Sequence, residues 1–359
     1  MAVMRLRLLT PGPVNLHPAA LQALTRPQLH HRSPEATAIV RALRTRLAEL
    51  LGTRGEVLLV GGSGTAAMEA VVRALFRPGA RVWVPVAGKF AERWAEIARA
   101  AGLEPQVSEH PWGAVVGPDD LPPGRLDGAL LTHSETSTGV LHPVRELAAA
   151  VRARSPEALV VVDAVTSFLV AELELESWGL DAAVSGSQKG AMAPPGLAFA
   201  WLAPRALERL RPSGYYLDLS RELTAQRRGQ TAFTPPIQII EAVHDVLEAA
   251  WPQGRDDLAR HWAAKHEANA RFYARGDELG LRPVPAREEA RSPATAAFYL
   301  PEGWTAGDLS AAFAERGWRV AGGQGPLKGR IFRVSAMGYF TRAELERAYG
   351  DFTAVLRRS

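Results

Sequence analysis

DAAVSGSQKGAMAPPGLAFAWL, residues 181–202, contains two apolar runs of strand length on either side of a turn that carries one lysine, Lys189. Small or uncharged residues, 185–188, precede this lysine, Gly190 follows it, and no acidic residue stands beside it. For any single lysine, exposure in a loop is the ordinary interpretation. The alternative is a lysine whose amine reacts. The sequence around this stretch has to decide between the two.

Apolar runs of the same length recur along the chain and alternate with segments of helical periodicity. Residues 35–51 repeat apolar positions at helical spacing and stop at Gly52. This alternation predicts an α/β protein with a mostly parallel sheet covered by helices on both faces. Ligands of such sheets bind at the carboxyl ends of the strands, so informative residues should directly follow the apolar runs. The other predicted strands before residue 180 are 57–60, 81–86, 128–134 and 159–165, and the other predicted helices are 65–76 and 90–102.

The composition and the pattern of apolar runs change near residue 245. A long segment rich in Arg, Ala and Glu, residues 256–280, is followed by the short apolar runs ATAAFYLP, WRVAGG and IFRVSAMG. This mixture predicts a smaller α+β domain. We therefore expect an N-terminal strap over residues 1–20, a large domain over 21–245 and a small C-terminal domain over 246–359.

Composition excludes several classes of protein. Hydrophobic residues make up 47% of the 359 positions and charged residues 22%, which is ordinary for a globular protein. The net charge of +4 is spread along the chain, so we expect no nucleic-acid partner. The absence of cysteine excludes disulfides, cysteine-ligated metals and thiol catalysis. Pro11 and Pro13 interrupt the start before a signal-peptide core, and no apolar window approaches membrane-spanning length. We expect a cytoplasmic protein with no membrane contact.

Two of the predicted strands are followed by residues that suit a ligand. Gly61-Gly62-Ser63-Gly64-Thr65 opens a helix, and a helix N-terminus with close backbone approach suits a phosphate, although a tight turn capped by Ser63 is the alternative. The stretch lacks the Gly-Lys-Ser/Thr ending of a P-loop, which makes a nucleotide site the weaker interpretation. Asp163 follows the apolar run 159–162, where an unpaired buried carboxylate would be costly. It is either an N-cap or ion-pair residue or the partner of a cationic ligand nitrogen.

The combination of these features is more specific than any one of them. A phosphate cradle, the carboxylate of Asp163 and Lys189, 26 positions later, all stand at strand ends. Pyridoxal phosphate requires these three contacts: a lysine for its aldehyde, an acid for its protonated pyridine nitrogen and a cradle for its phosphate. A free lysine is neutral in only about one molecule in 2,500 at pH 7, so an uncharged loop that does not stabilise the ammonium form suits a reactive amine. The sequence therefore favours the reactive interpretation of Lys189.

Motifs spread over nearly the whole chain carry a family resemblance. They are LLTPGPVNL, VGGSGTAAMEA, LTHSETSTGVLHP, VVVDAVTS, DAAVSGSQKGAMAPPG and IFRVSAMG, and SGSQK followed by Pro-Pro-Gly is particularly diagnostic. The chain resembles the class V aminotransferases of fold type I, in the alanine–glyoxylate and serine–glyoxylate (serine–pyruvate) group. The resemblance implies a large pyridoxal-phosphate-binding domain, a small C-terminal domain, and a homodimer with shared active sites.

The resemblance also implies roles for individual residues. Lys189 would hold the cofactor and then shuttle the substrate's Cα proton, and Asp163 would keep the pyridine nitrogen protonated. Arg333 would clamp the substrate carboxylate through two charged hydrogen bonds of about 1.5–3 kcal/mol each. Phe90 would stack on the cofactor ring, with Ser137 beside it. The phosphate contacts would come from Ser63, Gly64, Thr65 and Gln188.

The segment TAFTPP, residues 231–236, would reach the phosphate of the neighbouring subunit. Thr234 matches a threonine of the family, whereas Thr231 stands where a tyrosine is common, so its phosphate contact is left open. Thr65 stands where some members of the family have histidine. The N-terminal TPGPV strap would lie over the dimer interface.

The reaction implied is transamination between alanine or serine and glyoxylate or pyruvate. The motifs place one carboxylate clamp, Arg333, and no second arginine in the site, which disfavours dicarboxylic substrates. A phosphoserine aminotransferase is an alternative, with Arg32 or Arg228 as the extra basic residue. A non-catalytic module that senses an amino acid through bound cofactor is a further alternative. A cysteine desulfurase is excluded because it needs a cysteine nucleophile.

Overall fold

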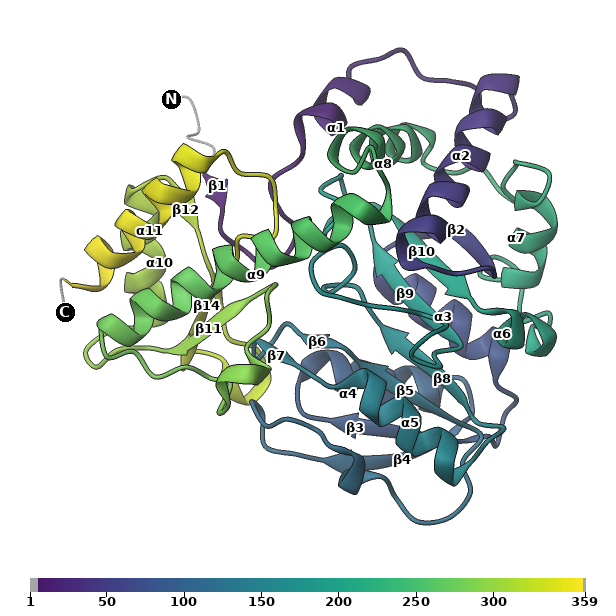
Figure 1. Ribbon diagram of the computed structural model, residues 1–359, viewed down its shortest axis with the longest axis horizontal. Coiled ribbons are helices and arrows are strands. Elements are labelled where there is room, and N and C mark those ends of the chain that lie inside the picture. Colours follow the sequence, from purple (N-terminus) through teal and green to yellow (C-terminus); the bar gives the residue numbers. More distant parts are fainter. Residues whose placement is uncertain (1–5, 358–359) are drawn as a thin grey trace.

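The computed structural model describes residues 6–357 and has two lobes. Figure 1 shows a larger lobe built around a seven-stranded sheet on the right and a smaller one around a three-stranded sheet on the left. The long helix α9 (Arg255–Glu278) runs from one lobe to the other. This architecture confirms the predicted α/β class, with a mostly parallel sheet and a smaller α+β part. The residue limits of the three proposed parts remain a proposal.

The large lobe is built on seven strands, of which six run in the same direction. They are β2 (Glu56–Gly62), β3 (Arg81–Val86), β4 (Glu104–Glu109), β5 (Gly128–Thr132), β8 (Leu159–Asp163), β9 (Ala182–Gly186) and β10 (Gly196–Leu202). Their order across the sheet is β2-β10-β9-β8-β5-β3-β4, and β10 is antiparallel to both of its neighbours. The carboxyl ends of β2, β8 and β9 therefore lie at the same edge of the sheet.

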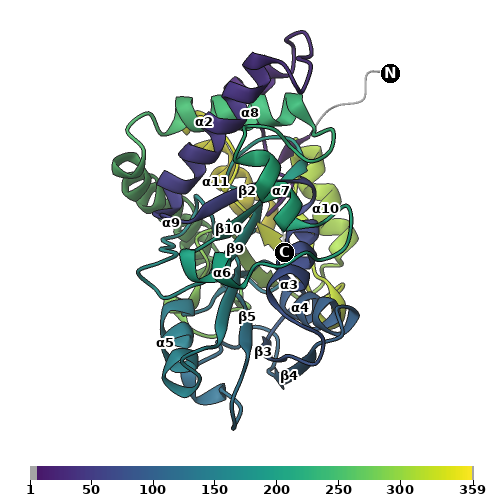
Figure 2. The same cartoon turned by 90° about the vertical axis from the view of Figure 1, so that its right-hand side faces the viewer.

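Helices cover both faces of this sheet because alternate residues of each strand point to opposite sides. In β8, Val160 and Val162 pack with the core of one face, and Val161 packs with the core of the other. Figure 2 shows the strands between α5 on one side and α3 and α4 on the other. One face carries α2 (Pro34–Leu51), α5 (Val144–Arg154) and α8 (Ile237–Ala250), and the other α3 (Gly64–Leu75), α4 (Lys89–Ala100), α6 (Pro204–Arg209) and α7 (Leu219–Gln226). The helix α1 (Pro18–Ala23) packs on α8.

Local signals set the helix limits close to where the sequence predicts them. The helix α2 begins after Ser33, whose side chain caps the amide of Ala36, and ends at Gly52 in the left-handed conformation. The predicted limits of α2, α3, α4 and α9 differ from the observed ones by one or two residues, as expected where helix ends fray.

The small lobe packs helices on a short antiparallel sheet. Its core is aromatic, and Phe298, Phe332 and Phe352 lie in mutual ring contact. The elements are β11 (Ala296–Tyr299), β13 (Ala321–Gly322), β14 (Ile331–Val334), α10 (Ala306–Glu315) and α11 (Arg342–Leu356), with sheet order β11-β14-β13. The first described strand, β1 (Arg7–Leu8), pairs with β12 (Trp318–Arg319) of this lobe. The described part of the chain therefore begins on the small lobe and crosses to the large one through residues 9–17.

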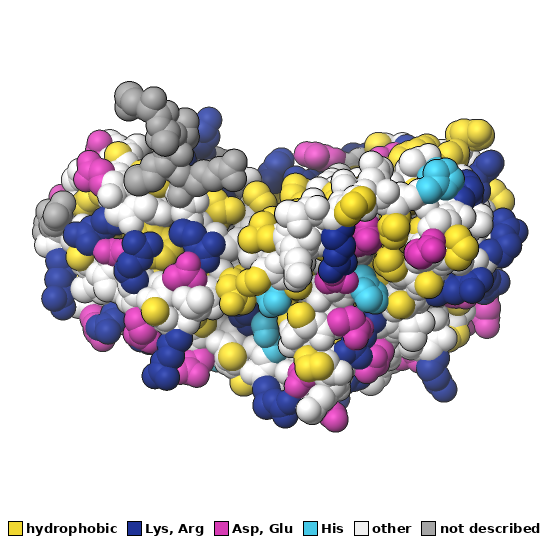
Figure 3. Space-filling model, turned by 90° about the horizontal axis from the view of Figure 1, so that it is seen from above, with side chains coloured by type: hydrophobic (Ala, Val, Ile, Leu, Met, Phe, Trp, Pro, Cys, Tyr) yellow, Lys and Arg dark blue, Asp and Glu magenta, His cyan; other side chains and the backbone are white. Residues whose placement is uncertain are grey.

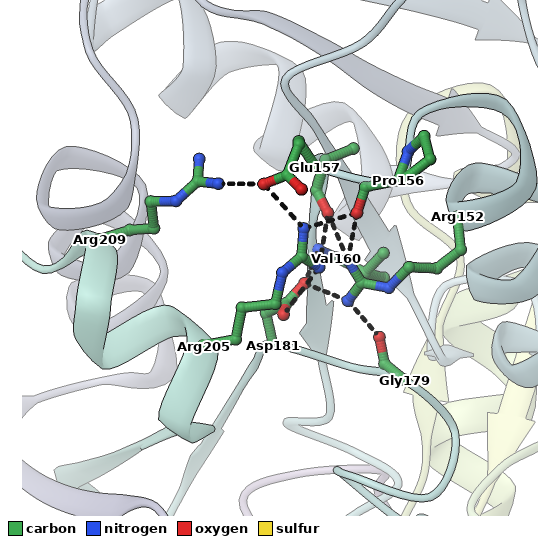
Figure 4. A network of polar contacts seen from close by, with 9 residues as sticks. Arg152, Pro156, Glu157, Val160, Gly179, Asp181, Arg205 and Arg209 are labelled. Carbon is green, nitrogen blue, oxygen red and sulfur yellow. Dashed lines mark hydrogen bonds and ion pairs between the residues drawn. The ribbon is translucent and has the colours of Figure 1, made fainter.

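A buried ion-pair network secures the amino-terminal edge of the sheet, opposite the end that carries Lys189. Asp181, which is 2% exposed, precedes β9 and accepts hydrogen bonds of 2.7 Å from Arg152 Nη2 and from the amide of Val160. Arg205 lies 3.5 Å from the other carboxylate oxygen (Figure 4). Because these residues belong to α5, β8 and α6, one carboxylate connects three elements.

Charged side chains of both signs mix on the surface. On the face in Figure 3, lysine and arginine side chains lie among acidic ones. Within residues 6–357, no helix combines the length and apolar character needed to cross a membrane. The predicted lack of a nucleic-acid partner stays a prediction.

The remaining short elements frame the loop that follows β5. The two-residue strands β6 (Ser134–Glu135) and β7 (Val140–Leu141) form a small hairpin there. This hairpin carries part of the candidate site.

Candidate active site

A cavity of about 350 Å³ opens at the carboxyl edge of the large sheet. Its walls come from the ends of β8 and β9, the start of α3, the first turn of α4 and the strap residues Gly12 and Pro13. Most of the predicted cofactor-binding residues meet here although they are far apart in sequence. The lining residues that the sequence predicts are Ser63, Gly64, Thr65, Phe90, Asp163, Gln188 and Lys189.

Lys189 is a buried lysine that reaches this cavity from the turn after β9. Its side chain is 8% exposed, and its Nζ donates a 2.6 Å hydrogen bond to the carbonyl of Pro11. Burial lowers the pKa of Lys189 to about 8, with Asp163 opposing this shift and Arg333 adding to it. About one molecule in ten then carries the neutral amine at pH 7, far more than for a free lysine.

The strap passes directly over this lysine. A Cβ atom at Gly12 would lie 2.5 Å from Lys189 Nζ, and Gly12 has a φ of 127°, so glycine is required on both counts. The placement of the strap over a dimer interface stays a prediction, but within one chain the strap covers the amine of Lys189. It thereby separates Nζ from bulk water.

Asp163 ends β8, next to the strand that leads to Lys189. It is 5% exposed, and its Oδ1 accepts a 2.8 Å hydrogen bond from the amide of Val165. Burial raises the pKa of Asp163 to about 6, and the nearby charge of Glu135 acts in the same direction. A positively charged partner would lower this pKa again, so the position suits the cationic ring nitrogen of a ligand.

The start of α3 has capacity for an anion. Ser63 occupies the N-cap position, yet its side chain makes no capping hydrogen bond. The Oε1 atom of Gln188 is buried and has no hydrogen-bond partner among residues 6–357. A helix N-terminus with an uncommitted hydroxyl beside it can bind a phosphate. The Oε1 atom of Gln188 only accepts hydrogen bonds, so this side chain would bind a phosphate through its amide NH2 group. The residues present therefore fit pyridoxal phosphate: an amine, a carboxylate and an anion cradle line one cavity.

Glu135 is a buried carboxylate that the sequence analysis did not select. Its Oε2 accepts hydrogen bonds from the amides of Phe90 and Ala91 at 3.0 and 3.1 Å, and its Oε1 accepts from the amide and the hydroxyl of Ser137. Burial raises the pKa of Glu135, although these four bonds favour its ionised form. Because it caps the start of α4, Glu135 fixes Phe90 at the cavity wall.

Ser137 takes part in the same arrangement. Its Oγ accepts a 3.0 Å hydrogen bond from the amide of Lys89, so it ties the β6–β7 hairpin to the first turn of α4. A Cβ atom at Gly88 would collide with the side chains of Glu135 and Ser137, which explains a glycine just before α4. The THSETSTG stretch thus holds α4 in place through both turn chemistry and hydrogen bonds.

Arg333 lies on β14 of the small lobe and is 6% exposed. Its Nε and Nη2 donate to the carbonyl of Gly322 at 2.9 and 2.6 Å, and its Nη1 donates to the carbonyl of Thr136 at 2.8 Å. Burial lowers the pKa of Arg333 to about 10, so it stays charged at neutral pH. A guanidinium has five N–H donors. Three are used here, and two remain, one on each terminal nitrogen. Arg333 is not among the residues that line the cavity, and its contact with a substrate carboxylate stays a prediction.

Arg93 is an arginine of the cavity wall that the motifs did not place there. It lies on α4, lines the cavity and donates a 3.1 Å hydrogen bond from Nη1 to Thr65 Oγ1. Arg93 is the arginine among the residues that line this cavity, and the substrate role of Arg333 stays a prediction. Helical spacing offers a signal that could have found it, because Arg93 follows Phe90 by three residues and shares its face.

Thr231 and Thr234 do not reach this cavity within one chain. They line a separate pocket beside β2, together with Tyr216 and Phe233. Thr231 donates a 2.6 Å hydrogen bond to the carbonyl of Phe233. Their predicted contact with a neighbouring subunit stays a prediction.

The family model and the similar solved structures agree on an aminotransferase family. The family model described as aminotransferase class-V matches residues 19–347. A solved structure described as an aspartate aminotransferase of subgroup IV from Thermus thermophilus is 54% identical, with a TM-score of 0.94 over 98% of this chain and 99% of that chain. An alanine–glyoxylate aminotransferase structure from Nostoc sp. is 29% identical, with a TM-score of 0.90 over 99% and 97%. A relative named as the small subunit of a soluble hydrogenase, from Synechococcus sp., is 36% identical over 97% of this chain and 92% of its own length.

Proposed function

Because this chain belongs to the class-V aminotransferase family, we propose that it transfers an amino group from alanine or serine to glyoxylate or pyruvate with pyridoxal phosphate as cofactor. The protein is an aminotransferase, and its family acts on amino acids and 2-oxo acids. One observation carries the choice of cofactor and reaction: Lys189 and Asp163, at the ends of two neighbouring strands, share one cavity with the start of α3. The hydrogenase name of one relative describes that protein, and we carry nothing from it.

Different residues of the cavity have different roles in transamination. When bound, pyridoxal phosphate supplies an aldehyde for the amino group and a ring that accepts electrons from the substrate's Cα. Lys189 holds the cofactor and then moves the Cα proton on its Nζ, and burial makes this amine more available as a base near neutral pH than a free lysine. Asp163 stays ionised beside the cationic ring nitrogen and keeps that nitrogen protonated.

Other side chains bind and orient the cofactor and the substrate. Phe90 packs against the ring from the first turn of α4, which Glu135 holds in place. Arg333 directs its two remaining N–H groups to the substrate carboxylate and serves both half-reactions, since donor and acceptor each carry one. The strap residues Pro11 and Gly12 exclude water from Nζ.

We propose small monocarboxylic substrates because the family resemblance assigns one carboxylate clamp, Arg333, which keeps two N–H donors without a partner in the described part of the chain. The alternative is a dicarboxylic donor, and the aspartate aminotransferase name of the 54% identical structure favours it. Arg93 supplies a second positive charge in the cavity that such a donor could use. Phosphoserine is a further alternative, and a non-catalytic sensor is disfavoured because the full set of Lys189, Asp163 and Arg333 is present.

A substrate panel tests this proposal. kcat/KM is measured for serine, alanine, aspartate, glutamate and phosphoserine, with glyoxylate and then with pyruvate as acceptor. We expect alanine or serine to have the highest kcat/KM. A preference for aspartate or phosphoserine would replace the monocarboxylic assignment, and a lack of transamination with every donor would refute the proposed reaction.

We also propose that the protein acts as a homodimer in which TAFTPP, residues 231–236, completes the phosphate site of the other subunit. Sedimentation velocity of active protein should give a dimer. Fully active monomer would contradict this arrangement. The cytoplasmic location stays a prediction.

A further inference from the structure

Arg93 is a cation at the cavity wall without an anionic partner. Its contacts among residues 6–357 are the hydrogen bond to Thr65 Oγ1 and a position over the ring of Phe90, 4.9 Å from the ring centroid. No ion pair links it to a carboxylate within the described part of the chain. Asp163 lines the same cavity. Burial raises the pKa of Asp163 and the charge of Arg93 opposes this shift, but no ion pair joins the two side chains. A guanidinium in a cavity without a directly bonded carboxylate indicates a site for an anionic ligand.

The sequence of α4 gives Arg93 two acidic neighbours that it does not use. Glu92 and Glu96 both turn to Lys89, at 2.8 and 3.6 Å from its Nζ. Glu96 stands three residues after Arg93, a spacing at which helical ion pairs usually form. The two glutamates therefore leave the guanidinium of Arg93 directed to the cavity.

The position of Arg93 indicates which anion it binds. Its partner Thr65 belongs to the first turn of α3, where the helix N-terminus meets the cavity. Arg333, the arginine for the substrate carboxylate, is held instead by the carbonyls of Thr136 and Gly322. The guanidinium of Arg93 thus lies at the end of the cavity that suits the phosphate.

The charge balance of this end requires such a group. A phosphate monoester carries a charge of about −1.5 to −2 at neutral pH. A helix N-terminus offers the equivalent of roughly +0.5. The other cradle side chains of this chain, Ser63, Thr65 and Gln188, are neutral. Arg93 would add a full positive charge beside these neutral groups.

We propose that Arg93 binds the phosphate of pyridoxal phosphate, with Thr65 fixing its guanidinium and Phe90 supporting it from the side. This inference rests on the proposed function, since it requires that cofactor. Arg93 then serves cofactor affinity, and substrate selection is left to Arg333. The residue is a further cofactor-binding group in addition to those that the sequence predicts.

The test compares two probes that differ only in the phosphate. The full-length protein, freed of cofactor, is titrated by equilibrium dialysis with pyridoxal phosphate and, separately, with pyridoxal. The variants are Arg93→Gln and Arg93→Lys. Arg99→Gln is the matched control, because Arg99 is an exposed arginine of the same helix.

We expect Arg93→Gln to weaken pyridoxal phosphate binding by about 10- to 150-fold, the effect of one charged hydrogen bond. Pyridoxal binding should change by less than about threefold, because it lacks the group that Arg93 binds. Arg93→Lys should recover part of the loss, and Arg99→Gln should behave as the wild type.

Four outcomes would overturn the inference. Equal weakening of both probes would assign Arg93 to the placement of Phe90. Unchanged binding of both probes, with a selective rise in KM for aspartate, would assign it to a second substrate carboxylate. If the wild type binds pyridoxal phosphate no better than pyridoxal, the phosphate cradle is absent. If the wild type binds neither probe, the proposed function fails together with this inference.

Discussion

Replacing Arg333 gives the sharpest test of how this site holds a substrate. Three of its five N–H donors are bonded to the carbonyls of Gly322 and Thr136, so the guanidinium is fixed before any substrate arrives. Two donors remain for a carboxylate, and each charged hydrogen bond contributes about 1.5–3 kcal/mol. Arg333→Ala should therefore cost about 3–6 kcal/mol of binding, which corresponds to roughly 10²- to 10⁴-fold in kcat/KM.

The assay follows the two half-reactions separately, with the amino donor and with the 2-oxo acid. Because both substrates present one carboxylate to the same arginine, the loss should be similar in the two directions and should fall mainly on KM. Arg333→Lys keeps a charge but lacks the planar pair of donors, so it should recover only part of the activity.

Stability has to be monitored in the same experiment. Arg333→Ala leaves the carbonyls of Gly322 and Thr136 without their donor, at a cost of about 1–3 kcal/mol for each group that stays buried. Kinetics are therefore measured well below the midpoint of thermal unfolding. Arg330→Ala is the matched control, since Arg330 is an exposed arginine just before β14. A loss confined to one half-reaction, or an equal loss in the control, would refute the assignment of Arg333.

The remaining predictions concern three buried charged groups. For Lys189, borohydride should fix the mass of pyridoxal phosphate on this residue. The rate at which the residue captures the cofactor should rise about tenfold from pH 6 to 7 and level off above a pKa of about 8, because burial lowers the lysine pKa from 10.5. A capture rate that still rises at pH 10 would mean an exposed amine. Asp163→Asn should retain the cofactor and slow transamination by about 10²- to 10³-fold, the usual effect of losing one fixed electrostatic partner, and near-normal turnover would make the carboxylate structural. Asp181→Asn should lower the free energy of unfolding by about 3 kcal/mol, because it removes the charge shared by two partly exposed arginines at 25% and 30% exposure. Urea titration measures this loss and compares it with the loss in Glu157→Gln. That variant removes an exposed ion pair with Arg209 and should lower the free energy of unfolding by less than about 1 kcal/mol. Equal effects of the two substitutions would contradict the argument.

The fold and much of the candidate site are predictable from the sequence because short local patterns of apolar residues encode them. Apolar runs that alternate with helical segments can bury both faces only as a mostly parallel sheet between helices. Such a sheet aligns the carboxyl ends of its strands, so residues that directly follow apolar runs meet in space. Asp163 and Lys189 illustrate this, because neighbouring strands bring them to one cavity although 26 positions separate them.

The tertiary structure alone decided which distant groups surround that pair. Nothing in the local pattern of Glu135 indicates that its carboxylate caps α4, because the cap depends on how the β6–β7 hairpin packs against that helix. Similarly, the sequence does not distinguish Arg93 from the many other arginines on helices. Only the packing of α3 against α4 brings it to Thr65. The carbonyl of Pro11 reaches Lys189 only because the strap crosses between the lobes. Periodicity and turn chemistry are encoded within a few residues, whereas these contacts depend on the relative placement of whole elements, which no short stretch of sequence specifies.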